Sequence, residues 1–270
     1  MKGYDIMKLF IAEIKKNIFT LKTLICIFAV VVVSLLCYNQ DLLYVFFNND
    51  EASFSIIDLI DYFIGIGVFR NIILIIISLP FVGVFCDEWN SKNIYSVLVR
   101  CNIKEYAVSK ITSCAIGCMA VSFIGLVLLS GLFSFFIPLS GEETAVNFVS
   151  DVPYGFLVQK YPVLYLLIRI FIFSLFSSVW CVFGLFSSAM ISNKFVSFAM
   201  PLIGYYTIGN LCDYLPDFLN INRITNCSNI LGNNTLLTFI YSLLFYISII
   251  VIFILLFYKA VQRRVNNEFN

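Results

Sequence analysis

The sequence predicts an all-α polytopic membrane protein with six transmembrane helices. The chain of 270 residues is 61% hydrophobic and only 12% charged. Its mean hydropathy of +0.95 is far above that of a soluble domain, in which apolar residues make up about half. Apolar runs of roughly 20 residues, the length that crosses a hydrocarbon core as a helix, recur along the chain. They are continuous rather than alternating, which disfavours a transmembrane β-barrel.

The chain begins with a basic amphipathic segment, predicted as a helix over residues 5–22. One face carries the apolar residues Ile6, Met7, Phe10, Ile11, Ile14, Ile18 and Leu21. Lys8, Lys15 and Lys22 lie opposite. This pattern is typical of a helix lying on the inner membrane surface. The alternative is that the segment is the frayed start of the first span.

Six apolar runs are expected to cross the membrane, over residues 24–38, 62–85, 111–137, 163–191, 195–212 and 236–258. Arg70 interrupts the second run, so two arrangements remain open. Either residues 59–69 form a short outer-surface or re-entrant helix, or Arg70 extends outward to the acidic residues that precede it. Pro80 is expected to kink the inner half of this span.

The distribution of basic residues predicts the orientation. With the N-terminus inside, only Arg70, Lys160, Arg169 and Arg223 of the 17 Lys and Arg residues fall outside. This bias follows the positive-inside rule for six spans with both termini cytoplasmic. The loops are too short for a soluble domain, so residues 1–270 are expected to form a single membrane domain.

Composition disfavours several classes of function. The chain has no histidine, which removes His-based catalytic triads and HExxH metal sites. The net charge of +1 argues against nucleic acid as a partner. Cys114 and Cys118 lack further ligands for a metal and are interpreted as small buried residues. A disulfide between Cys212 and Cys227 is left open, because sequence does not fix its geometry.

Small residues mark two faces on which helices are expected to pack closely. The third span carries Cys114, Cys118, Ser122 and Gly125 at helical spacing, and the fourth carries Ser177, Cys181, Gly184 and Ser188. The alternative for either face is that it lines a substrate path.

The polar loop over residues 86–110 holds the candidate functional surface. Ile94, Val97 and Leu98 share one face of a short predicted helix between the charged residues Lys92 and Arg100. Asn102, with Glu105 three residues on, forms a capping-box pattern that predicts a new helix from Ile103 into the third span. An apolar stripe on such a helix fits a groove on a partner protein. Alternatively, the helix rests on lipid headgroups.

These features resemble type-2 ABC-transporter permeases. Glu88, the segment Ile94 to Leu98, and Lys110 stand where that family has an acidic residue, a coupling helix and a lysine opening the third span. The half-polar segment 213–235 is similar to the family's outer re-entrant helices. Ser91-Lys92-Asn93 replaces the Gly-Thr that often follows the acidic residue, and no proline occupies residues 99–102. The absence of a large outer domain is similar to small permeases of bacteriocin or antimicrobial-peptide export and self-protection.

The resemblance implies a transport subunit, rather than an enzyme, in the bacterial plasma membrane. No GxxxxGK[ST] phosphate loop is present, so ATP and Mg²⁺ would bind a separate ATPase subunit and no cofactor is expected in this chain. A second permease chain, identical or related, would complete an exporter for a hydrophobic or amphipathic peptide or lipid-like substrate. The residues expected to contact the ATPase are Glu88, Lys92, Asn93, Ile94, Val97, Leu98, Arg100, Asn193 and Lys194.

Three other functions remain open. A secondary transporter or channel would require paired charges inside the membrane, for which Arg70 and Arg169 are the candidates. An intramembrane enzyme could use Glu142 and Glu143, although these residues fit a solvated outer loop better. A non-catalytic immunity or accessory membrane protein could share the fold.

Overall fold

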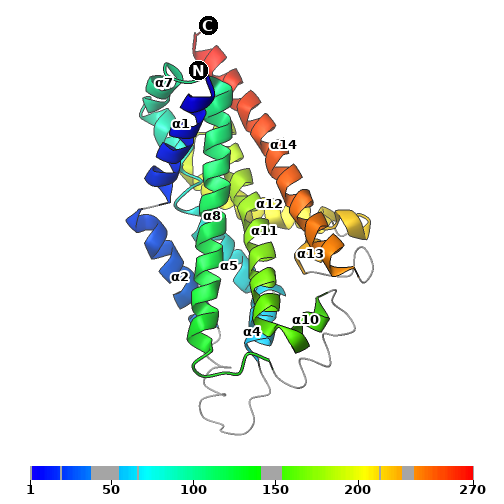
Figure 1. Cartoon of the computed structure of the whole chain (residues 1–270). Coiled ribbons are helices and arrows are strands. Elements are labelled where there is room, and N and C mark those ends of the chain that lie inside the picture. Colours follow the sequence, from blue (N-terminus) through cyan, green and yellow to red (C-terminus); the bar gives the residue numbers. More distant parts are fainter. Residues whose placement is uncertain are drawn as a thin grey trace.

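The computed structural model of the chain is a bundle of helices (Figure 1). It describes residues 2–18, 20–37, 55–65, 67–140, 154–212, 214–226 and 234–269. Within these residues every regular element is a helix. The first helix begins and the last helix finishes at the same end of the bundle, which we call the terminal end.

Four helices are each long and apolar enough to cross a membrane. These are α8 (Ile103–Phe133), α11 (Pro162–Met190), α12 (Lys194–Cys212) and α14 (Thr235–Phe269). They coincide with the predicted third to sixth spans. Two bent helix pairs raise the number of candidate spans in the described residues to as many as six. The chain is therefore an all-helical protein with the composition of a membrane protein.

The predicted helix over residues 5–22 is interrupted. α1 (Lys2–Asn17) and α2 (Leu21–Cys37) meet at an angle of 56°. The hydroxyl of Thr23 donates a hydrogen bond of 2.9 Å to the Asn17 carbonyl oxygen and holds the bend. Lys22 thus belongs to the second helix, not to the first. We call Asn17, Ile18, Thr20 and Leu21 the elbow.

The second predicted span is also interrupted. α4 (Ile56–Gly65) and α5 (Gly67–Ser78) meet at 77°, so α4 is a separate helix rather than the start of a continuous span. The Arg70 side chain does not extend outward, because it is only 4% exposed and its Nη2 donates 2.9 Å to the Gly65 carbonyl oxygen. α5 ends before Pro80 and α6 (Val84–Asn90) begins after it, so the proline marks a break rather than a kink.

α11 is the central helix. Of its most apolar stretch 78% is buried, against 11% for α14, which lies at the edge. The two predicted small-residue faces pack against neighbouring helices. They meet each other, and the face on α11 also contacts α12. The Ser177 hydroxyl donates 3.2 Å to that of Ser122, joining α11 to α8. Gly184 instead lets Pro201 of α12 approach, because a Cβ there would lie 2.7 Å from the proline ring.

The remaining short elements lie toward the other end of the bundle. α10 (Gly155–Lys160) precedes α11, and a 3₁₀ turn (Asp217–Leu219) leads into α13 (Ile221–Thr225) within the half-polar segment. α14 continues well past the predicted span, so the basic tail is helical. Cys212 is buried and forms no disulfide with a cysteine among the described residues. Cys227, whose pairing with Cys212 was left open, and the acidic pair Glu142 and Glu143 lie outside the described residues.

Candidate functional site

A tight turn reverses the chain at the terminal end between α6 and α7 (Asn93–Leu98). The Ser91 hydroxyl donates 2.6 Å to the Asp87 carbonyl oxygen and closes α6. Lys92 then adopts the left-handed backbone conformation, with φ of 59° and ψ of 9°. This conformation normally favours glycine, because a side chain there crowds the following carbonyl. The turn starts the predicted short helix at Asn93.

The predicted capping box forms where the loop enters the third span. Asn102 has extended backbone angles, and its N–H donates 3.2 Å to Oε2 of Glu105. α8 begins at Ile103, as predicted. The loop therefore continues without a break into a spanning helix of 31 residues.

The expected contact residues on the loop face two ways. Ile94 is fully buried in the core of this chain, so its side chain attaches α7 to the bundle instead of facing a partner. Val97 and Leu98 are half-buried. Of the expected contact residues on the loop, Lys92, Asn93 and Arg100 are exposed. Val99, which was not among them, is 87% exposed.

Aromatic rings join the loop to the end of α14. The Trp89 ring lies 5.8 Å from that of Phe85 and 6.4 Å from that of Tyr95. Phe85 in turn meets Phe257 edge-on at 5.4 Å. The guanidinium of Arg264 lies 5.1 Å from the Trp89 ring, a cation–π contact. The basic tail is thus part of the same surface as the loop.

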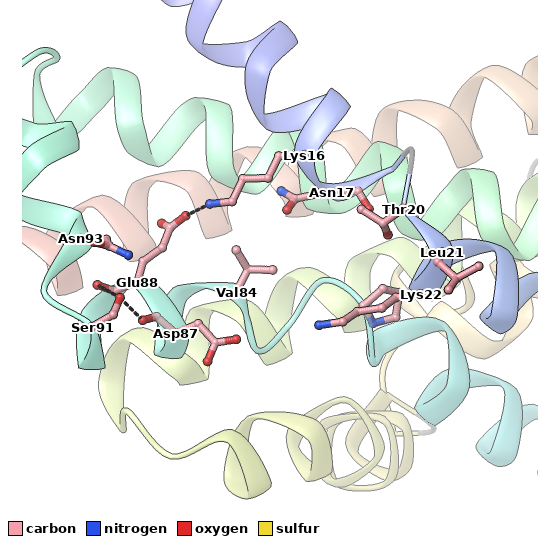
Figure 2. A pocket seen from close by; sticks show the side chains of 11 residues that line it. Lys16, Asn17, Thr20, Leu21, Lys22, Val84, Asp87, Glu88, Ser91 and Asn93 are labelled. Atoms are coloured by element: carbon pink, nitrogen blue, oxygen red, sulfur yellow. Dashed lines mark hydrogen bonds and ion pairs between the residues drawn. The ribbon is translucent and has the colours of Figure 1, made fainter.

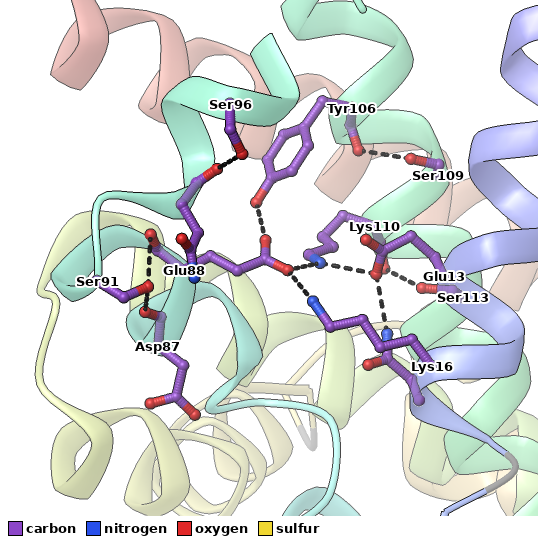
Figure 3. A network of polar contacts seen from close by, with 12 residues as sticks. Glu13, Lys16, Asp87, Glu88, Ser91, Ser96, Tyr106, Ser109, Lys110 and Ser113 are labelled. Atoms are coloured by element: carbon purple, nitrogen blue, oxygen red, sulfur yellow. Dashed lines mark hydrogen bonds and ion pairs between the residues drawn. The ribbon is translucent and has the colours of Figure 1, made fainter. Parts of the chain in front are cut away.

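Beneath this surface, a buried ion network connects α1, α6 and α8 (Figure 3). The ammonium of Lys110 lies 2.7 Å from a carboxylate oxygen of Glu88 and 2.7 Å from one of Glu13. Lys16 approaches the same Glu88 oxygen at 2.7 Å. The Tyr106 hydroxyl donates 2.8 Å to the other Glu88 oxygen. Two cations therefore balance two carboxylates. Ion pairs link α1 to both α6 and α8, and α6 to α8.

Burial and charge oppose each other at Glu88. Its side chain is only 7% exposed, and burial alone would raise the pKa of the carboxyl. The ammonium groups of Lys110 and Lys16 outweigh burial, however, and hold the pKa of Glu88 below its ordinary value. Glu88 is thus a buried, ionised link between helices, whereas the sequence analysis expected it to contact an ATPase.

The second expected contact, the turn at Asn193 and Lys194, lies beside the loop. The Lys194 ammonium forms an ion pair with Asp87 of α6. The Asn193 side chain accepts a hydrogen bond of 2.9 Å from the Phe195 N–H and caps α12. The structure therefore brings both predicted contact segments to the same end of the bundle.

A cavity of 530 Å³ opens between the elbow and α6 (Figure 2). It is lined by Lys16, Asn17, Thr20, Leu21, Lys22, Pro80, Val84, Asp87, Glu88, Ser91 and Asn93. The Lys22 side chain points across this space toward α6 in Figure 2. The walls combine charged and amide groups with apolar surface, so the cavity suits an amphiphilic ligand.

A second polar cluster lies away from the terminal end. Arg169 forms an ion pair with Asp61 of α4 and donates 2.7 Å to the Thr225 carbonyl oxygen of α13. Tyr165 donates 2.9 Å to the other Asp61 oxygen. Arg169 is therefore compensated by a carboxylate. Arg70 forms no ion pair among the described residues, and its guanidinium lies 5.7 Å from the ring of Phe176 and 5.2 Å from the ring of Tyr205.

Sequence reasoning missed three members of the ion network, Glu13, Lys16 and Tyr106. The sequence analysis considered only the apolar and basic residues of the first helix and therefore overlooked Glu13. In the structure Glu13 and Asn17 are both buried on one side of α1. An available signal was that Glu13 and Asn17, four residues apart, lie on the apolar side of the predicted helix and not beside Lys8, Lys15 and Lys22. Tyr106 gave no signal, since an aromatic residue near the start of a span is also typical of a membrane interface.

Comparison with known protein families, with curated proteins and with solved structures returned no match. Among the described residues, no three His, Cys, Asp or Glu side chains are grouped to hold a metal ion.

Proposed function

We propose that the chain is the transmembrane subunit of an ATP-driven ABC exporter. It would lie in the bacterial plasma membrane with the terminal end in the cytoplasm, as the distribution of basic residues predicts. ATP and Mg²⁺ would bind a separate ATPase subunit, because this chain contains no phosphate loop. The substrate class is a hydrophobic or amphipathic peptide or lipid-like molecule, moved outward.

One observation carries the proposal. The short, partly exposed helix α7 follows α6, and buried ion pairs link α6 to α1 and α8. α7 follows α6 directly, and Glu88 of α6 bonds Lys16 of α1 and Lys110 of α8. A displacement of α6 and α7 by an ATPase would therefore move α1 and a spanning helix with them. Such a linkage suits coupling better than a loop resting loosely on lipid.

The surface available to the ATPase is charged and apolar together. Lys92, Asn93 and Arg100 are exposed around Val99, and Val97 and Leu98 are half-buried beneath them. Asn193 and Lys194 lie at the edge of this surface. A central apolar contact with a polar rim is the usual anatomy of a protein interface.

A second permease chain would complete the translocation path. α14 supports this part of the proposal, because its apolar stretch is only 11% buried within one chain. An identical or related partner, or membrane lipid, would cover that face.

Affinity purification from the native host tests the proposal. The tagged chain is expected to co-purify with an ATPase that carries a GxxxxGK[ST] motif, identified by mass spectrometry. Leu98→Asp and Val99→Asp are expected to reduce its recovery by about tenfold, because truncating a central interface residue costs on the order of 1–2 kcal/mol. Val99 is 87% exposed, so its variant leaves the fold of the chain intact.

Phe135→Asp is the matched control, because Phe135 is an 81% exposed apolar residue just past the far end of α8. This variant should retain the ATPase. If no ATPase co-purifies with the wild-type chain, or if the loop variants recover as much as Phe135→Asp, the proposal is wrong.

Arg70 favours a secondary transporter as the second candidate function. Its Nε and Nη1 atoms are buried without a hydrogen-bond partner, and a cation inside a membrane protein often marks an ion or substrate path. Transport measured in cells depleted of ATP distinguishes an ABC exporter from a secondary transporter. Continued transport that stops only when the ion gradient collapses would identify the secondary transporter.

A further inference from the structure

The elbow between α1 and α2 faces two hollows of different character. The cavity of 530 Å³ on the α6 side has charged and amide walls. A second hollow of 470 Å³ lies between the elbow and α8, and its walls are almost entirely apolar. Its lining residues are Ile18, Thr20, Leu21, Thr23, Leu24, Ile27, Ala120, Val121 and Ile124. Thr20 and Leu21 line both hollows, so polar and apolar walls meet at the elbow.

The polar hollow has an excess of available positive charge. Asp87 is paired with Lys194, and the buried carboxylates of Glu13 and Glu88 are balanced by Lys110 and Lys16. Lys22 forms no ion pair within the part of the chain that the structure describes. Lys16 also faces the hollow, with a side chain that remains 58% exposed despite its ion pair. An anionic ligand would therefore find the uncompensated ammonium of Lys22 beside the partly exposed ammonium of Lys16.

The surroundings of the elbow are strongly apolar. Leu21 is 74% exposed and Leu24 is 52% exposed, and both begin the α2 helix that is predicted to enter the membrane. With α2 in the membrane as predicted, the hollow would open at the level where lipid headgroups meet acyl chains. Basic pockets between helices at this level are suited to anionic lipid headgroups.

We infer that the elbow binds an anionic phospholipid from the leaflet at the terminal end. Its phosphate group lies between Lys16 and Lys22 in the polar hollow. An acyl chain passes Leu21 and lies along the apolar groove between α2 and α8. A free phosphate compound would use only the charged walls, whereas a phospholipid uses both hollows.

The bound lipid would hold α1 against the membrane next to the ion network. Lys16 connects the two sites, since its ammonium faces the polar hollow and bonds Glu88 at 2.7 Å. This inference requires only the chain and a membrane. It therefore stands or falls separately from the proposed ATPase partner.

Native mass spectrometry of the purified full chain tests the inference. The chain is titrated with phosphatidylglycerol and with phosphatidylcholine of identical acyl chains. The wild-type chain is expected to prefer phosphatidylglycerol. Lys22→Gln should reduce that preference about fivefold, because one basic residue near an anionic surface contributes about 1 kcal/mol.

Lys15→Gln is the matched control. It removes the same charge from an exposed position on α1 that does not line the cavity, and it should keep the wild-type preference. Glycerol 3-phosphate in millimolar excess should not displace the bound lipid, because it lacks an acyl chain. Equal binding of the two lipids by the wild-type chain, equal effects of the two variants, or displacement by glycerol 3-phosphate would each overturn the inference.

Discussion

Glu88 of α6 and Lys110 of α8 form a buried ion pair of 2.7 Å at the terminal end of the bundle. The Lys110 side chain is only 2% exposed, and Glu13 of α1 bonds the same ammonium. Removing such charges from water is costly, and an apolar cluster of the same volume would hold three helices as well. We interpret the ions as fixing the register of α1 and α6 on the spanning helix.

Lys110→Met is expected to destabilise the chain by about 3–5 kcal/mol, because it leaves Glu13 and Glu88 buried with too little positive charge. The measurement is the thermal unfolding midpoint of the detergent-solubilised chain, followed by tryptophan fluorescence. Lys104→Met is the control, since Lys104 is exposed one turn and a half earlier on the same helix. It should shift the midpoint little.

A compensated variant checks the physical reason. Combining Lys110→Met with Glu13→Gln and Glu88→Gln removes the unpaired charges, so most of the lost stability should return. If Lys110→Met unfolds at the same temperature as Lys104→Met, the buried ions do not hold these helices together.

Stability should depend on the ionisation of Glu88 in acid. Its pKa is held below the ordinary carboxyl value by Lys110 and Lys16, which outweigh the effect of burial. The ionised group therefore contributes its full stabilisation above the ordinary pKa of about 4.3, and this contribution is lost as the pH falls through the lowered pKa.

The difference in unfolding midpoint between the wild-type chain and Glu88→Gln isolates this contribution. It should be constant from about pH 7 to pH 5 and shrink at lower pH. A difference that grows on acidification would mean that the pKa of Glu88 is raised rather than lowered.

Local signals in the sequence were sufficient for the element boundaries that depend on neighbouring residues. Asn102 and Glu105 satisfy the first backbone N–H groups of a helix, so the start of α8 at Ile103 could be predicted. Long apolar runs likewise predicted α8, α11, α12 and α14, because their length alone matches a membrane.

Contacts between distant residues could not be predicted in the same way. Lys16 and Glu88 are 72 positions apart, and no periodicity records which carboxylate meets which ammonium. An apolar stripe shows that a helix buries one side but not what it packs against, so Ile94 was assigned to a partner instead of to its own core. Arg70 left two arrangements open for residues 59–69, and no local pattern decides between them, because the choice depends on what Arg70 contacts in the folded chain.

Lys92→Gly is expected to stabilise the turn between α6 and α7. A non-glycine residue in the left-handed conformation costs roughly 1 kcal/mol, which glycine avoids. The gain is partly offset because glycine also loses more freedom on folding. Lys92→Val should instead lower the unfolding midpoint, because a β-branched side chain is still less compatible with a φ of 59°. Equal midpoints for the two variants would contradict the left-handed turn.

The two buried arginines should respond differently to replacement. Arg169→Met leaves Asp61, whose side chain is 12% exposed, without its cation and removes the bond to the Thr225 carbonyl, so a loss of about 3–5 kcal/mol is expected. Arg70→Met removes one hydrogen bond and two ring contacts, but it also removes a buried cation with two unpartnered nitrogens. The loss of stability for Arg70→Met should be smaller, below about 2 kcal/mol.

The unfolding midpoints of both variants, measured in the same detergent, test this contrast. If Arg70→Met is the more destabilised, the Arg70 guanidinium is compensated in the folded protein and the contrast with Arg169 is wrong.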